Sequence, residues 1–392
     1  MMVSLRGNRV IPVLALMALA LLWSLDFVSV QPNRIAPGNG LGLLAAVGLP
    51  WALTLTAALL ACALLALRPQ QPAYWPILWL VSLLVLQLPL SLAWSIERHI
   101  GADMPYARVG IGAGYWSLLF LLGLLLIELQ QRLRLARAWL LGSGIALALL
   151  LWWLAPQDWL EPLALLREYS SRRSQFAAAL ASHLGLVGGA VGLSLLLGGA
   201  IALLLQRYPG AQKGSIGLLS FIQTIPSLAL FGLLIAPLSY LSAQFPWLQQ
   251  LNIRGIGWAP ALLALIAYSL LPIVRNTCVA LAEVEAAVIE SARGMGMSPT
   301  QVFLQVRLPL AMPLIIEGVR VTSIQAIGLT AVAALIGAGG FGTFIFQGLG
   351  QSAMDLIILG ALPIIALALL ADSLFSLLAE RFYSGVGDDR AE

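Results

Sequence analysis

Residues 290–309 read ESARGMGMSPTQVFLQVRLP and lie between two apolar stretches that are each long enough to cross a membrane. The segment is moderately polar, is interrupted by glycine and ends in proline, whereas most of the chain is strongly apolar. Its local signals predict two short helices that meet at a sharp angle. Such a rigid connector is suited to docking a partner, but an ordinary amphipathic connector on the membrane surface would show the same pattern.

The first of these helices should occupy residues 281–292, because the sequence LAEVEAAVIESA consists of strong helix formers. Gly294 and Gly296 follow, and glycine readily takes the left-handed conformation that closes a helix. We therefore expect the chain to bend at these two glycines.

The second helix should begin at Pro299. Ser298 is a hydroxyl N-cap, Pro299 suits the first helical position, and Gln301 stands three residues after the cap, which is a capping box. The helix should be short and should end by about Val306, with Pro309 leading into the next span. We expect its exposed apolar residues to be Val302, Phe303 and Val306.

The composition of the 392-residue chain requires a membrane environment. The chain is 60% hydrophobic and 10% charged, and its mean hydropathy is +0.94. Apolar runs of about 20 residues recur along it, and in lipid such runs must be helices. We predict an all-α polytopic protein with about ten transmembrane helices, at residues 10–29, 43–66, 75–95, 112–129, 138–155, 181–206, 215–239, 257–279, 312–336 and 354–379.

Charge is distributed as expected for a membrane protein rather than a nucleic-acid-binding protein. The net charge is +4 and the pI is about 9.3, but the basic residues stand in short loops beside apolar spans. With ten spans, most of them fall on one side, which predicts that both termini are cytoplasmic. The loop at residues 159–175 is the main exception. The first span is also compatible with a signal sequence.

Two halves are predicted. Residues 161–185, EPLALLREYSSRRSQFAAALASHLG, are more polar than the preceding sequence and have amphipathic character, which indicates an interfacial helix. We place the boundary there, with residues 1–175 as an N-terminal region of five spans and residues 176–392 as a core of five. The halves show no obvious repeat, and Cys62 and Cys278 are interpreted as buried small side chains.

The segment between spans eight and nine resembles a known pattern. Glu290-Ser291-Ala292, three residues, Gly296, nine residues and the sequence VRLP are similar to E-A-A, x3, G, x9, I-x-L-P of permease subunits of binding-protein-dependent ABC importers. Ser291 replaces an alanine and Val306 an isoleucine. Residues 222–234 (IQTIPSLALFGLL), 271–277 (LPIVRNT) and 333–349 (AALIGAGGFGTFIFQGL) resemble the glycine betaine, carnitine and choline, or osmoprotectant, branch.

The resemblance covers about residues 176–392 and implies a type I, MetI-like permease core in a bacterial cytoplasmic (inner) membrane. Its implied partners are an ABC ATPase dimer, a second permease subunit that is identical or a shorter paralogue, and a periplasmic or extracellular substrate-binding protein. ATP and Mg would bind to the ATPase, and no P-loop occurs in this chain. Residues 1–175 look like the extension of some bacterial betaine-type permeases, and we expect them to stabilise or regulate the core.

In this interpretation residues 281–309 form the ATPase-coupling loop. Glu290 and Ser298 would hold its geometry, and Glu290 would pair either with Arg293 or with an arginine of the ATPase. Met297, Val302 and Phe303 would face the partner. The candidate coupling residues are Glu290, Ser291, Ala292, Gly294, Gly296, Met297, Ser298, Val302, Phe303, Val306, Leu308 and Pro309.

A transport pathway has weaker signals. The glycine-rich residues 336–350 would lie on the outer side, either lining the path, docking a binding protein or packing closely. Aromatic rings attract quaternary ammonium groups, so phenylalanines in the core could contact such a substrate, although packing in an apolar core explains the same phenylalanines equally well. The candidate pathway residues are Phe221, Phe231, Gly339, Gly340, Phe341 and Phe344.

Two other classes of function would require different sequence features. An ion-coupled secondary transporter would require acids or bases deep in the membrane, and the candidates all stand near predicted span ends: Asp26, Glu128, His183, Asp355 and Asp372. Asp372 could lie a turn or two further inside its span. A membrane enzyme would require clustered catalytic groups, and neither such a cluster nor a metal-binding motif is found in the sequence.

Overall fold

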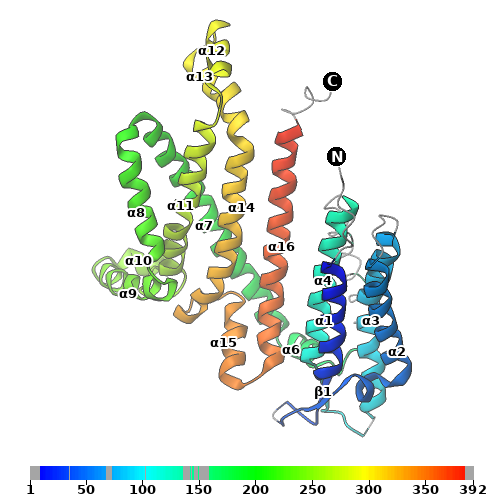
Figure 1. Cartoon of the computed structure of the whole chain (residues 1–392). Coiled ribbons are helices and arrows are strands. Elements are labelled where there is room, and N and C mark those ends of the chain that lie inside the picture. Colours follow the sequence, from blue (N-terminus) through cyan, green and yellow to red (C-terminus); the bar gives the residue numbers. More distant parts are fainter. Residues whose placement is uncertain are drawn as a thin grey trace. The chain divides into compact units, whose positions relative to one another are not determined.

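The computed structural model describes residues 9–34, 36–67, 73–101, 103–135 and 159–384, together with residues 142, 144 and 149. Contacts divide the chain into two compact units, Met1–Ser171 and Arg172–Glu392 (Figure 1). The predicted span at residues 138–155 lies outside the described residues, apart from the three isolated positions.

The first unit is built on four apolar helices, α1 (Val10–Ser24), α2 (Leu43–Ala66), α3 (Tyr74–His99) and α4 (Ala113–Leu133). Helix α1 packs against α2 and α4, and α3 packs against the same two helices, so the four enclose one core. Leu22, Leu55 and Leu118 are fully buried in that core. Helix α1 has 15 residues, fewer than the predicted 10–29, because the chain becomes extended at Leu25.

A small antiparallel sheet closes one end of the first unit. It has the order β2-β1-β3, with β1 (Val28–Gln31) between β2 (Asn39–Leu41) and β3 (Arg108–Ile111). Helix α6 (Ala164–Ser171) packs on β3. The three strands have three or four residues each, which is too short for alternation to predict them.

Glu168 of α6 forms ion pairs with two arginines at this end of the first unit. Its side chain is buried, and its Oε1 accepts hydrogen bonds from Arg34 Nε at 2.9 Å and from Arg108 Nη1 at 2.7 Å. Arg167 beside it donates to the carbonyl oxygens of Pro105 and Ala107. The polar character of this segment therefore serves packing on the sheet.

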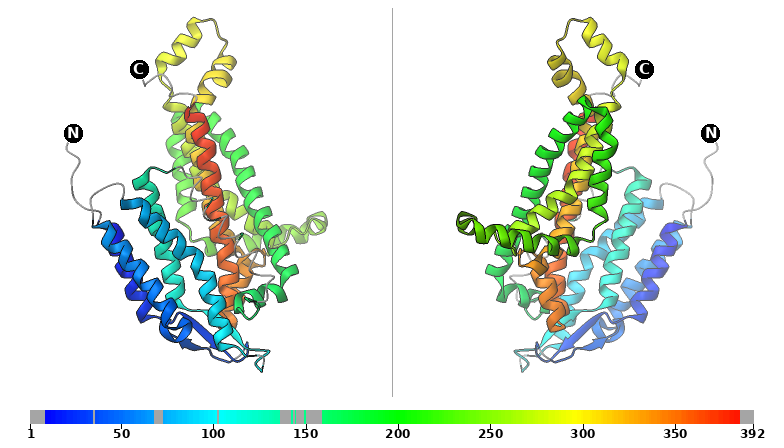
Figure 2. Two further views of the ribbon diagram at one scale, coloured as in Figure 1. Left: turned by 90° about the vertical axis from the view of Figure 1, so that its right-hand side faces the viewer. Right: turned by 90° about the vertical axis from the view of Figure 1, so that its left-hand side faces the viewer.

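The second unit contains the long helices α7 (Arg173–Arg207), α11 (Trp258–Ala282), α14 (Leu308–Ala333) and α16 (Met354–Ser384). Helix α11 packs between α7 and α14, and α14 packs against α16 (Figure 2). Several separate apolar clusters hold these helices together, in contrast to the single core of the first unit.

The predicted span at residues 215–239 is wrong as a single helix. The chain forms α8 (Gln212–Thr224), breaks at Ile225 and Pro226, and continues as α9 (Ser227–Gln244) and the short α10 (Pro246–Gln250). Helix α9 runs across the direction of α8 (Figures 1 and 2). Proline disfavours helical geometry in the residue before it, and the Tyr268 hydroxyl donates to the carbonyl oxygen of Ile225 at the break.

Eight described helical segments are long and apolar enough to cross a membrane. The all-helical polytopic fold is thus confirmed. The count is below the predicted ten because α1 has 15 residues and because residues 138–155 lie, apart from three isolated positions, outside the part of the chain that the structure describes. The eight segments are Leu43–Ala66, Tyr74–His99, Ala113–Leu133, Arg173–Arg207, Ser227–Gln244, Trp258–Ala282, Pro299–Ile336 and Met354–Phe382.

Candidate functional site

The segment between α11 and α14 extends beyond the ends of the helices of the second unit (Figure 1). Helix α11 ends at Ala282, and α12 (Ala286–Gly294) follows after a short break. A turn then leads to α13 (Pro299–Gln301) and to one π-helical segment, η4 (Val302–Arg307), before α14. The predicted bend is present, but the first helix covers residues 286–294 rather than 281–292.

Gly296 makes the bend. Its φ of +84° lies in the left-handed region, and its N–H donates to the Arg293 carbonyl oxygen at 2.9 Å. Gly294 is the last residue of α12 and has no positive φ. A side chain at either glycine would meet open space, so only the backbone conformation distinguishes the two positions.

The capping box at the start of α13 is confirmed. The Ser298 N–H donates to Gln301 Oε1 at 2.8 Å, and the Gln301 N–H donates to Ser298 Oγ at 3.4 Å. These reciprocal bonds satisfy two amide groups that the helix start would otherwise leave exposed. Sequence alone was sufficient to find this local feature.

Arg307 fixes the point where the loop returns to the membrane helices. Its Nε and Nη2 donate to the carbonyl oxygen of Leu281 at 3.0 and 2.8 Å, and Nη2 also donates to Gln206 Oε1 at 2.7 Å. Three segments of the second unit, η4, α11 and α7, therefore meet at one guanidinium group. In the sequence Arg307 is only one basic residue of the loop, and no neighbouring residue indicates these contacts.

The expected surface of the second helix is partly wrong. Val302 is 4% exposed and Phe303 is half-buried against the apolar cluster around Leu281. The reason is that α13, η4 and α14 form one continuous helix, so that Pro309 lies in the first turn of α14 instead of ending the loop. The exposed apolar side chains are instead Val288, Met295 and Leu304.

The candidate coupling residues are otherwise spread over the loop surface and its base. Glu290 and Ser291 are exposed, Ala292 is 2% exposed, and Met297 is half-buried. Ser291 Oγ donates to the Ala287 carbonyl oxygen at 2.8 Å. Among the described residues Glu290 makes neither an ion pair nor a side-chain hydrogen bond, so a pair with Arg293 is not formed here.

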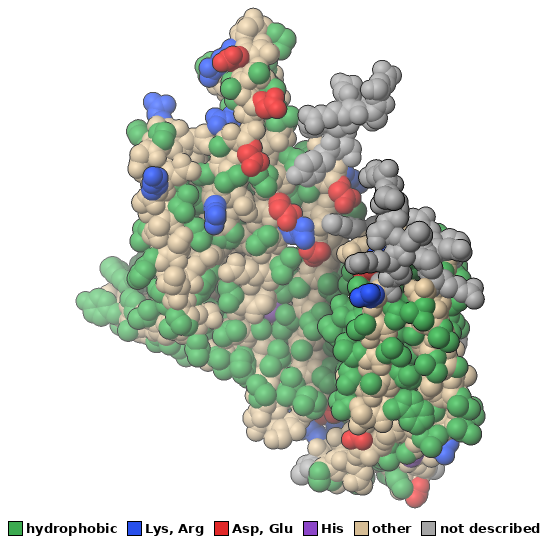
Figure 3. Space-filling model, viewed as in Figure 1, with side chains coloured by type: hydrophobic (Ala, Val, Ile, Leu, Met, Phe, Trp, Pro, Cys, Tyr) green, Lys and Arg blue, Asp and Glu red, His purple; other side chains and the backbone are tan. Residues whose placement is uncertain are grey.

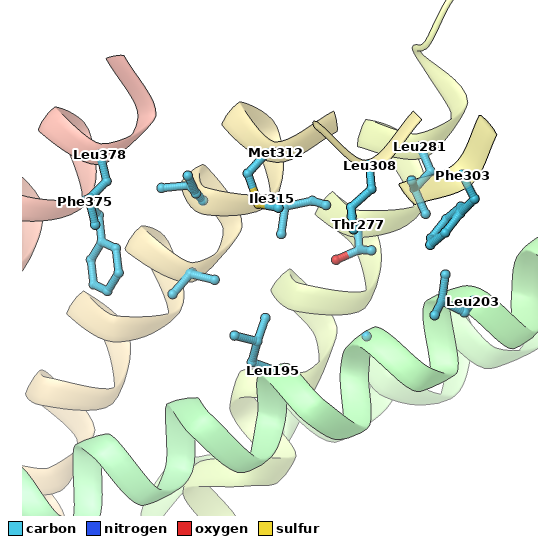
Figure 4. A pocket seen from close by; sticks show the side chains of 13 residues that line it. Leu195, Leu203, Thr277, Leu281, Phe303, Leu308, Met312, Ile315, Phe375 and Leu378 are labelled. Atoms are coloured by element: carbon cyan, nitrogen blue, oxygen red, sulfur yellow. The ribbon is translucent and has the colours of Figure 1, made fainter. Parts of the chain in front are cut away.

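An apolar cavity of about 430 Å³ lies beneath the loop, between α7, α11, η4, α14 and α16. Phe303 points into it from η4, and Phe375 points into it from α16 (Figure 4). Among the described residues that line the cavity, Thr277 alone has a polar side chain. The other lining residues are Leu195, Gly199, Leu203, Leu281, Leu308, Met312, Ile315, Ile316, Val319 and Leu378.

A cluster of three charged residues joins the middles of α14 and α16. Arg320 Nε donates to Asp372 Oδ1 at 2.7 Å, and Arg320 Nη1 donates to the Glu317 carboxylate at 3.0 and 3.1 Å. The three side chains are between 27% and 41% exposed. Asp372 was a candidate from the sequence, whereas Glu317 and Arg320 were not, although the sequence EGVR inside an apolar run could have indicated them.

The glycine-rich segment is closely packed at the end of the second unit opposite the loop. Gly337, Gly339 and Gly340 have positive φ, and α15 (Gly342–Gln351) follows. A Cβ at Gly342 would lie 1.9 Å from the Ala331 carbonyl oxygen, so a larger residue cannot fit. Close packing thus accounts for this glycine in the described structure.

The candidate pathway rings fall into two groups. Phe231, Phe341 and Phe344 are buried in the described structure, whereas Phe221 of α8 is 64% exposed. The ring of Phe341 packs against Phe176 and against His183, which is fully buried within α7 rather than near its end. Core packing explains the three buried rings, and a role in a pathway stays a prediction.

Comparison with known proteins identifies the class. Residues 194–383 match the family described as binding-protein-dependent transport system inner membrane component, and residues 8–166 match the N-terminal domain of ABC transporter permease YehY. The chain belongs to the first of these families and is a permease subunit of an ABC importer, a class whose members are not catalytic and work with an ATPase and a binding protein.

Several relatives are similar to about half of the chain. The osmoprotectant import permease protein OsmW of Salmonella typhimurium is 40% identical over 190 residues, which are 48% of this chain and 83% of OsmW. The carnitine transport permease protein OpuCB of Listeria monocytogenes is 38% identical over 48% of this chain and 80% of OpuCB. The choline transport system permease protein OpuBB of Bacillus subtilis is 36% identical over 51% of this chain and 85% of OpuBB.

A weaker likeness is found among solved structures. An inward-facing structure of the MetNI methionine ABC transporter aligns with 54% of this chain and 97% of the solved chain, at 20% identity and a TM-score of 0.46. The assignment to the permease family is independent of it, since it follows from the sequence relatives.

Proposed function

We propose that this permease imports glycine betaine, choline, carnitine or closely related quaternary ammonium compounds. The observation that supports this proposal is the 35–40% identity of about half of this chain to permeases named for osmoprotectant, carnitine and choline transport. This degree of similarity extends over most of the length of each relative.

The proposed coupling element is the loop at residues 281–309. Two partner ATPase subunits would bind ATP and Mg, and each would receive one loop from a pair of permease subunits. The loop is stiff at three points: the left-handed turn at Gly296, the capping box at Ser298 and the Arg307 bonds. A stiff projection can transmit a rigid-body movement of a docked partner to the membrane helices.

The proposed orientation places the loop and both termini in the cytoplasm. Most basic side chains on the visible face of the second unit lie toward the end that carries α12 and α13 (Figure 3). Arg207, Lys213, Arg293 and Arg381 stand at the helix ends and loops on that side. This asymmetry follows the positive-inside rule, which favours a bacterial inner-membrane protein with the loop inside.

The test compares two glycines that have equal space around them. The complex of permease, candidate ATPase and binding protein is reconstituted in vesicles, and ATP-driven uptake of radiolabelled glycine betaine and choline is measured. Gly296→Val should lose ATPase co-purification and uptake, because a β-branched residue at positive φ is strained by roughly 1–3 kcal/mol. Gly294→Val, at a helical position with equal space, should retain both.

Three results would count against the proposal. Equal behaviour of the two valine variants would show that the loop conformation does not matter for coupling. Uptake driven by an ion gradient without any ATPase would favour a secondary transporter. ATP-driven transport of neither compound by the native complex would reject the substrate class.

A further inference from the structure

The cluster of Glu317, Arg320 and Asp372 lies within two helical segments that are long and apolar enough to cross a membrane, Pro299–Ile336 and Met354–Phe382. Arg320 follows Arg307, at the loop base, by 13 residues and precedes Ile336, at the opposite end, by 16. At 1.5 Å per residue these separations are roughly 20 and 24 Å, so the whole segment spans about the thickness of a bilayer with its headgroups. Arg320 is therefore about halfway along this helical segment.

Charged side chains within membrane-spanning helices need a physical explanation. Ionisable side chains inside a membrane are costly, avoid lipid, pair with one another and mark routes for ions or substrates. The cluster has two carboxylates and one guanidinium group, so its net charge is −1 when all three are ionised. Each side chain keeps more than a quarter of its surface exposed in the isolated chain. The group is thus paired but still accessible.

The cavity adjoins this cluster. Ile316 and Arg320 are four residues apart on α14, and Asp372 and Phe375 are three apart on α16, so each pair lies on one helix face a single turn apart. Ile316 and Phe375 both line the cavity. The charged cluster therefore lies about one helical turn from an apolar wall that includes an aromatic ring.

We propose that Glu317, Arg320 and Asp372, together with this wall, form a substrate site between the membrane-spanning helices α14 and α16. The inference rests on the proposed function and names the residues that would recognise the transported molecule. The carboxylates attract a methylated ammonium group, and its methyl groups lie against Ile316 and Phe375, where cation–π attraction adds to burial. Arg320 binds the carboxylate of a zwitterion such as glycine betaine.

Choline and glycine betaine distinguish this role from a structural one, because both carry the trimethylammonium group but only glycine betaine has a carboxylate. Uptake of each by the full reconstituted complex is measured for Glu317→Gln, Asp372→Asn and Arg320→Met. In the two acid-to-amide variants the uptake of both substrates should fall at least about tenfold. The reason is that a site built to bind a charged group binds it much more weakly once the opposite charge is removed. In Arg320→Met the uptake of glycine betaine should fall about tenfold more than the uptake of choline.

Two controls accompany these variants. Asp355→Asn makes the same chemical change near the start of α16, 17 residues from Asp372, and should leave uptake of both substrates near the native value. The double variant Arg320→Asp with Asp372→Arg restores an ion pair between α14 and α16 but exchanges the positions of the charges. It should not recover the native ratio of glycine betaine to choline uptake.

The outcomes separate the two proposals. Equal losses for both substrates in Arg320→Met, with recovery in the double variant, would overturn the substrate site and make the cluster a link between two helices. Unchanged uptake in all three single variants would overturn it as well. In both cases the native complex would still transport, so the proposed function would stand. A native complex that transports neither compound would reject both proposals.

Discussion

The two units of this chain are both helical, but they are packed in different ways. The first unit encloses one continuous core between four helices, and its buried carboxylate, Glu168, lies beside a small sheet at one end. The second unit is held by several smaller clusters, leaves an apolar cavity between five segments and places ion pairs in the middle of α14 and α16. The comparison indicates a self-contained first unit and a second unit with room for movement between its helices.

The largest expected effect concerns the buried carboxylate of the first unit. Glu168→Ala removes the acceptor for Arg34 and Arg108 and leaves Arg108 without this partner. Loss of one partner from a buried ion pair costs about 3–5 kcal/mol. Thermal unfolding of the full chain in detergent should show the loss, whereas Glu161→Ala, at an exposed ion pair with Arg167, should change stability by less than about 1 kcal/mol. Similar midpoints for the two variants would contradict the assignment of Glu168 as an anchor.

The next effect concerns the loop base of the second unit. Arg307→Ala removes three hydrogen bonds that join η4 to α11 and α7. Hydrogen bonds to charged groups contribute about 1.5–3 kcal/mol each when buried, and this side chain is half-buried, so we expect a loss of about 2 kcal/mol. Uptake per bound ATPase should fall more than ATPase binding does. If both fell in proportion, Arg307 would have only a structural role.

A smaller effect is expected at the N-cap of α13. Ser298→Ala removes one half of the capping box and should cost about 1 kcal/mol of local helix stability. The change should appear as faster amide hydrogen exchange at residues 298–302. Ser298→Asp, which keeps an acceptor at the cap, should exchange at the native rate. An alanine variant with native exchange would show that the loop is held by other contacts.

The smallest effect on stability, and the most direct test of the comparison, is to fill the cavity. Gly199→Leu adds a side chain at a position that lines the cavity and has no atom close to its Cβ. Filling such a space typically stabilises a protein by roughly 0.5–2 kcal/mol, so the melting temperature should not fall. Uptake should fall, since the space would no longer be available to a moving helix or a substrate. Native uptake by a more stable variant would show that the cavity has no role in transport.

The sequence predicted the features that depend on local chemistry. The bend, the capping box and the permease class were all accessible from residues 290–309, since caps, glycine and proline act over a few residues. The predicted lengths of most spans were also close to those of the observed helices, because a run of apolar residues directly indicates a membrane-spanning helix. The break at Ile225 had a local signal in Pro226, but the strength of the surrounding apolar run concealed it.

Features that depend on distant residues were missed. Val302 was expected at the surface because its helix was treated as separate, whereas the continuous helix turns that side chain toward the bundle. The bonds of Arg307 to Leu281 and Gln206 join positions 26 and 101 residues away in sequence. Arg320 and Asp372 are 52 residues apart, so only the packing of α14 on α16 reveals the pair.

The continuous helix from Pro299 to Ala333 has a mechanical consequence. Arg307 holds it near the loop base, where it can act as the fulcrum of a lever. At 1.5 Å per residue the arm from Arg307 to Pro299 is roughly 12 Å and the arm to Arg320 is roughly 20 Å. A sideways shift of about 2 Å at Pro299 would then swing Arg320 by about 3 Å in the opposite direction, which is enough to separate it from Asp372.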